Sequence, residues 1–172
     1  MPGIDLIDLN DPLLRERGEN ALRLITHEDD ELPDSLGFWY LWTAKEAVFK
    51  QKRELINFDP KEIPIKVSFD EEDQPVFASG QIGGRYLVRD NTIVALATLA
   101  EENSVLELIR SDTQNQSLKI RESILQYLKV NFNLETSIVS DGDGLPIIKA
   151  SGQPVSFTHH HYHMAFAFDQ AA

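Results

Sequence analysis

The chain has 172 residues, with 16 Lys or Arg against 28 Asp or Glu, so its formal net charge is −12. This length suits one domain, or two small halves that share a core. Apolar and charged fractions of 42% and 26% exclude a wholly disordered chain. The acidity argues against nucleic-acid binding, which needs a cationic surface. The absence of Cys excludes disulfides and thiolate chemistry. No apolar run reaches the ~18 residues of a membrane span, so we expect a cytoplasmic protein without a membrane partner.

The first hundred residues combine predicted strands with one long helix. Residues 3–9 resemble a short buried strand, and an N-cap with Pro at 10–12 predicts a helix that Gly18 interrupts. The strongest helical pattern covers about 35–54; it is apolar on nearly all faces, which is typical of a central, buried helix. Four strands are predicted after it, at 63–69, 75–78, 85–88 and 92–99.

The remaining residues repeat this alternation on a smaller scale. A second helix is predicted over about 113–131, where apolar residues recur at helical spacing. A glycine turn at 141–144 leads into strands at 145–149 and 155–168. No low-complexity linker separates the parts, so the sequence indicates two related halves rather than two independent domains.

A carboxylate lies on the aromatic stripe of the long helix. Trp39, Trp42, Glu46 and Phe49 follow one another at spacings of three or four residues and therefore share one face. An unpaired carboxylate is costly to bury there. Glu46 must therefore pair with a cation such as Lys50, bind a metal ion, or titrate near neutral pH.

Asp5 raises the same question in the first strand. Flanked by Ile4 and Leu6, it either faces solvent near a strand end or points into a site. Two carboxylates, one from a strand end and one from a helix, are suitable ligands for Mg²⁺, which prefers oxygen donors and retains waters and substrate phosphates.

Four of the five histidines lie between residues 159 and 163. A continuous strand would place His159, His161 and His163 on one face. Partly exposed structural histidines, a phosphate contact and a zinc or nickel site are the three open interpretations.

Together these features resemble a known family. Gly3-Ile4-Asp5, followed by a Trp42-Thr43-Ala44-Lys45-Glu46-Ala47 block that continues to Lys50, resembles the G-[IV]-D and W-[ST]-x-K-E-A-x-x-K motifs of the 4′-phosphopantetheinyl transferases. Gly144-Leu145-Pro146 is similar to the family's G-K-P, and Phe157-Thr158-His159 to its F-N-L-S-H. The K-E-A block is the most specific of these motifs.

The order of the motifs bears on the architecture. In two-half, surfactin-type members the half with G-K-P precedes the half with G-I-D, whereas here residues 1–100 carry G-I-D and K-E-A and residues 101–172 carry G-L-P and T-H. The resemblance therefore implies a circularly permuted, monomeric pseudo-dimer. Its α+β fold would have two halves related by a pseudo-twofold axis, each a helix packed on a small antiparallel sheet, joined near 100–104. The competing interpretation is the short, trimeric carrier-protein-synthase type with an inserted segment.

The resemblance also implies an activity, namely Mg²⁺-dependent transfer of 4′-phosphopantetheine from coenzyme A to a serine of an acyl or peptidyl carrier protein. Asp5 and Glu46 would hold Mg²⁺. Glu46 or a metal-bound water would accept the serine proton, and Lys45 would reach the phosphates and could protonate the leaving oxygen. The residues implied to contact coenzyme A are Lys45, Lys50, Thr158 and His159.

Several positions depart from the family's pattern. Ile7 stands where two-half members often have a second acidic residue, and Leu145 replaces the G-K-P lysine that contacts coenzyme A phosphate. These departures keep two other functions open: a non-catalytic relative that binds a carrier protein or coenzyme A, and a histidine-rich metal-binding protein.

Overall fold

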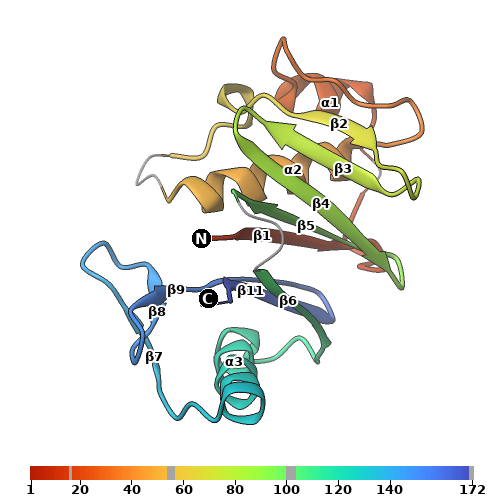
Figure 1. Cartoon of the computed structure of the whole chain (residues 1–172). Helices are drawn as coiled ribbons and strands as arrows, with labels where there is room; N and C mark the ends of the chain where they lie inside the picture. Colours follow the sequence, from red (N-terminus) through yellow and green to blue (C-terminus); the bar gives the residue numbers. More distant parts are fainter. Residues whose placement is uncertain (16, 54–56, 100–103, 171–172) are drawn as a thin grey trace.

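The computed structural model describes residues 1–15, 17–53, 57–99 and 104–170, which form an α+β fold (Figure 1). The helices are α1 (Glu19–Ile25), α2 (Phe38–Lys52) and α3 (Gln116–Phe132), with a 3₁₀ turn at Pro60–Glu62. The strands are β1 (Gly3–Asp8), β2 (Lys66–Phe69), β3 (Pro75–Ser79), β4 (Ile82–Arg89), β5 (Thr92–Thr98), β6 (Ser104–Arg110), β7 (Ile138–Ser140), β8 (Pro146–Ile148), β9 (Gln153–Pro154), β10 (Ser156–His160) and β11 (His163–Asp169).

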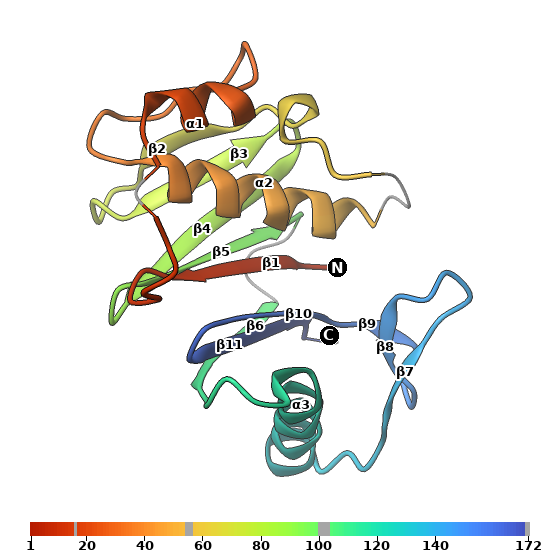
Figure 2. The same cartoon turned by 180° about the vertical axis from the view of Figure 1, so that it is seen from behind.

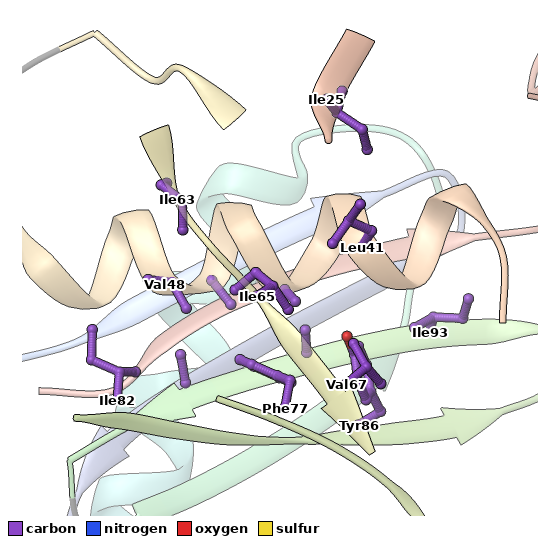
Figure 3. Packing of buried hydrophobic residues seen from close by; sticks show 14 of the residues in the cluster. Ile25, Leu41, Val48, Ile63, Ile65, Val67, Phe77, Ile82, Tyr86 and Ile93 are labelled. Atoms are coloured by element: carbon purple, nitrogen blue, oxygen red, sulfur yellow. The ribbon is translucent and has the colours of Figure 1, made fainter. Parts of the chain in front are cut away.

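The first half is a five-stranded antiparallel sheet in the order β1-β5-β4-β3-β2, with α2 packed against one face (Figure 1). Its core lies between the helix and the sheet. Figure 3 shows Leu41 and Val48 of α2 directed toward Ile65, Phe77 and Tyr86. The four strands predicted here are confirmed, with ends shifted by up to three residues.

The predicted long helix is also confirmed, and its described part begins and ends inside the predicted range. α2 starts at Phe38 because the backbone of Gly37 is extended. It ends at Lys52, and Arg53 follows in the left-handed conformation with φ of 54°. Residue 54, the predicted last residue, lies outside the described residues.

The second half places α3 on a three-stranded antiparallel sheet in the order β10-β11-β6, and β7, β8 and β9 form a separate small sheet. Ile120, Ile124 and Leu128 of α3 pack with Met164 and Phe166 of β11. The predicted helix at 113–131 is confirmed, with its first residue at Gln116.

The two halves share a strand order. In the first sheet the initial strand β1 pairs with the last strand β5, which pairs with β4; in the second, β6 pairs with β11, which pairs with β10. In the first half, α2 comes after β1 in the chain; in the second half, α3 comes after β6. The sheets face each other (Figure 2), and Ile4, Leu6, Val94, Ala165 and Ala167 fill the layer between them.

Two predictions in these regions are wrong, and one strand was not predicted. Residues 10–14 form turns, not a helix, and α1 begins only after Gly18. β6 was not predicted at all. The predicted strand at 155–168 is a hairpin of β10 and β11, whose turn holds His161 at a φ of 51°. The predicted joint at 100–104 falls between β5 and β6, and its residues 100–103 lie outside the described residues.

Candidate functional site

β1 lies unusually close to α2, which brings the two candidate carboxylates together. A Cβ atom on Gly3 would lie 2.0 Å from the Ala47 carbonyl oxygen and 2.3 Å from the Gln51 nitrogen. Only glycine permits this approach of two backbones. The close contact involves Gly3, two residues before Asp5 in β1, and residues 47 and 51 of α2, which follow Glu46. It therefore sets the distance between strand and helix at the site.

Asp5 and Glu46 share one ammonium group. Lys50 Nζ lies 2.7 Å from Asp5 Oδ1 and 3.6 Å from Glu46 Oε2. Burial raises the pKa of Glu46; the ammonium of Lys50 opposes this shift, and the charge of Asp5 adds to it. The expected pairing of Glu46 with Lys50 is confirmed, and the structure adds Asp5 as the closer partner.

The second half contributes Thr158, whose hydroxyl donates a hydrogen bond of 3.2 Å to Asp5 Oδ1. β1 and β10 run side by side in the same direction, and β10 supplies side chains to the free edge of β1. Ser156 Oγ accepts a bond from the Ile4 N–H, and His160 Nδ1 accepts one from the Asp8 N–H. Both pairs are 152 positions apart, which defines one register between the halves.

A cavity of about 250 Å³ lies beside this cluster, between the halves. It is lined by Met1, Phe49, Lys50, Arg53, Leu145, Pro146, Val155, Ser156 and Phe157. Apart from Met1, these residues come from the C-terminal end of α2, the G-L-P segment and the chain around the start of β10. Arg53 lies 2.6 Å from Asp141 across the halves. Backbone N–H groups of Leu145 and Asp143 and the Arg53 guanidinium outweigh burial, so they lower the pKa of Asp141.

Lys45 lies outside this cluster. Its side chain is fully buried, and its Nζ lies 2.7 Å from Asp30 and donates to the Pro60 and Ile63 carbonyls at 2.9 and 2.6 Å. Burial lowers the pKa of this ammonium, while Asp30 counteracts the shift. The ~100° between successive helical residues turns Lys45 toward the first half's interior. The expectation that Lys45 reaches the same phosphates as Glu46 is therefore wrong for this conformation.

His159 also lies elsewhere. Alternation along β10 places it on the face opposite Thr158, where its Nε2 lies 3.3 Å from Ser117 Oγ of α3. The expected placement of His159 with Asp5 and Glu46 is wrong. Because the chain turns back at His161, a common face for His159, His161 and His163 is also wrong.

The other three histidines of the 159–163 segment gather at the far end of β1, in a cluster that the sequence did not predict. His163 Nδ1 lies 2.8 Å from Asp8 Oδ2 and 3.1 Å from Thr92 Oγ1. His160 and His161 lie 3.5 and 3.9 Å from the Asp11 carboxylate. These contacts connect the turn of the β10–β11 hairpin to the first half.

A larger hollow than this cavity lies away from all these groups. It is an open groove of about 700 Å³ between α3 and the β6–β11 face, lined in part by Glu107, Arg110, Lys119, Glu122 and Met164. None of the predicted site residues lines it.

Within the described residues, no three His, Asp or Glu side chains are arranged to hold a metal ion among themselves. The paired carboxylates of Asp5 and Glu46 nevertheless have the donor chemistry that suits Mg²⁺, because that ion takes one or two protein carboxylates and completes its shell with water or phosphate oxygens. None of the helices in the described ranges has the length and apolar character to cross a membrane.

Comparisons with family models, curated proteins and solved structures returned no match for this chain. The site is therefore interpreted from its own geometry and from the motifs in the sequence.

Proposed function

We propose that this chain is a two-half 4′-phosphopantetheinyl transferase that moves the phosphopantetheine group of coenzyme A to a serine of an acyl or peptidyl carrier protein. The observation that carries the proposal is the meeting of Asp5 and Glu46 at Lys50, beside Thr158 and a cavity lined from both halves. Asp5 belongs to the G-I-D motif and Glu46 to the K-E-A motif, and the two are far apart in sequence.

The shared strand order of the two sheets supports the finer architecture. Initial strand, last strand and next-to-last strand are neighbours in both halves, and each sheet carries one long helix. This arrangement is what a permuted pseudo-dimer requires, and it leaves the candidate site within one chain rather than between subunits.

In the proposed reaction Asp5 and Glu46 would hold Mg²⁺, and this ion would supply positive charge to balance the pyrophosphate and the leaving 3′,5′-ADP. Glu46 would also accept the proton of the attacking serine hydroxyl, and burial raises the pKa of its carboxyl in the metal-free protein. Thr158 would orient the Asp5 carboxylate through its hydrogen bond, and its predicted contact with coenzyme A stays a prediction.

The neighbouring cavity is the proposed binding site for the phosphates of coenzyme A. Lys50 and Arg53 supply its positive charge, and Phe49, Leu145 and Phe157 give it an apolar wall. Lys45 and His159 have no part in this site because their side chains lie in the first-half interior and against α3.

One observation favours a second function. The cations of the cavity are already paired, Lys50 with Asp5 and Arg53 with Asp141, and Leu145 adds no charge. A non-catalytic relative that binds coenzyme A or a carrier protein without transfer is consistent with this thinner positive charge.

Mass spectrometry separates the two functions. The full chain is incubated with coenzyme A, Mg²⁺ and several apo-carrier proteins, and the carriers are then weighed. A transferase adds one phosphopantetheine group to at least one carrier, and the Asp5→Ala variant does not. Coenzyme A binding without any mass gain favours the non-catalytic relative, and absence of both contradicts the proposal.

A further inference from the structure

Lys50 lies between the two carboxylates that are the candidate metal ligands. Its Nζ stands between Asp5 Oδ1 and Glu46 Oε2 at 2.7 and 3.6 Å, and its side chain is 30% exposed. In the described part of the chain, these are the ion pairs that the two carboxylates make. An ammonium of one positive charge leaves the two carboxylates with one negative charge in excess, which a divalent ion would neutralise.

We propose that Lys50 is a built-in counter-ion that competes with Mg²⁺ for Asp5 and Glu46 and leaves them when the metal binds. The identity of the metal rests on the proposed function; the competition rests on the geometry of the three side chains. An ammonium and a metal ion cannot both contact the facing oxygens of two carboxylates at such short distances without strong repulsion.

The displaced ammonium has a place to go. Lys50 already lines the 250 Å³ cavity together with Arg53, and its flexible four-carbon stem can turn its head into that space. Metal binding then exchanges an internal ion pair for a cavity with an additional free positive charge. The apo-protein keeps one of the two carboxylate charges balanced by Lys50, so the fold does not depend on the metal.

Calorimetric titration of the full chain with Mg²⁺ alone tests the competition. Lys50→Gln removes the counter-ion and should tighten Mg²⁺ binding at least about fivefold, because the ion no longer has to displace an ammonium, and one ammonium–carboxylate contact near 4 Å contributes about this factor even in water. The matched control Lys52→Gln removes the same charge from an exposed position two residues on, and its affinity should stay within about twofold of the wild type. Unchanged or weaker binding by Lys50→Gln overturns the proposal.

The wild-type protein gives a second test that does not depend on the folding of a variant. An amine-acetylating reagent should label Lys50 slowly while it bridges the carboxylates, and saturating Mg²⁺ should raise its labelling rate relative to Lys52 at least about twofold at constant ionic strength. An equal rate with and without Mg²⁺ contradicts the displacement.

Failure here is distinguishable from failure of the transferase proposal. If Lys50→Gln binds Mg²⁺ more tightly but the wild type modifies no carrier protein, the counter-ion proposal stands and the transferase proposal fails. If the wild type modifies a carrier protein but Lys50→Gln does not change Mg²⁺ binding, the transferase proposal stands and the counter-ion proposal fails.

Discussion

Lys45 and Glu46 are adjacent in the chain, yet their side chains serve different parts of the molecule. Glu46 is on the side of α2 that faces β1 and Lys50, whereas Lys45 holds Asp30 and two carbonyls inside the first half. The sequence predicted the carboxylate cluster from the aromatic stripe and from Asp5. It could not predict the role of Lys45. Helical spacing indicates toward which side of α2 this residue points, but not that the buried carboxylate of Asp30 lies on that side.

The buried ion pair of Lys45 leads to a stability prediction. Lys45→Met leaves the Asp30 carboxylate, 2% exposed, without its cation and should cost about 3 kcal/mol or more of unfolding free energy. Urea denaturation measures the loss, and the exposed Lys52→Met is the control. A loss below about 1 kcal/mol would contradict the structural role of Lys45.

Thr158 and His159 give a matched pair on opposite faces of β10. Thr158→Val removes the hydroxyl that donates to Asp5 and should lower the unfolding free energy by about 1 kcal/mol. Ser117→Ala removes the partner of His159 on the exposed face and should change it by less than about 0.5 kcal/mol. Equal losses by chemical denaturation would refute the assignment of the two faces.

At the scale of elements, the sequence succeeded where an apolar run was continuous, as in β5, and missed β6, whose apolar run is interrupted by Glu107 and covered on both faces. β6 places Leu106 and Leu108 toward the first half and Val105 and Ile109 toward α3. Apolar residues on both faces remove the alternation that marks a half-buried strand. The turn after β10 was missed because His161 takes a positive φ without glycine or asparagine to signal it.

The contact between β1 and α2 depends on one glycine. Gly3→Ala places a methyl group against backbone atoms of Ala47 and Gln51, so strand and helix must separate, and we expect a loss of about 2 kcal/mol or more. Gly142→Ala has open space around it and should be nearly neutral. Thermal and urea unfolding of the two variants compare them directly; similar stabilities would mean that β1 has room to shift.

At the scale of the whole molecule, the Asp8–His163 contact joins the halves and makes stability depend on pH. Burial would raise the pKa of Asp8, but hydrogen bonds from the Asn10 N–H, His163 and the Tyr162 N–H together lower it below its usual 3.8. A carboxyl whose pKa is lower in the folded state stabilises the fold above its usual pKa, and that contribution is lost as pH falls through the folded value.

Asp8→Asn should therefore flatten the acid side of the stability profile. The wild type should lose unfolding free energy more steeply than the variant as the pH falls below about 3.8. Well above this pH, the difference in unfolding free energy between the two proteins should be constant. Urea denaturation across this range measures both curves. Parallel curves through this window would show that Asp8 has the same pKa in the folded and unfolded chain.

The central claim is that Asp5, Glu46 and the cavity between the halves form one site for coenzyme A and Mg²⁺. Calorimetric titration of the full chain with coenzyme A, with and without Mg²⁺, tests it without knowledge of the carrier protein. We predict binding by the wild type that is stronger with Mg²⁺, and loss of this Mg²⁺ dependence in Asp5→Ala and in Glu46→Ala while both variants remain folded. Coenzyme A binding with the same Mg²⁺ dependence in both variants, or no binding by the wild type, would contradict the claim.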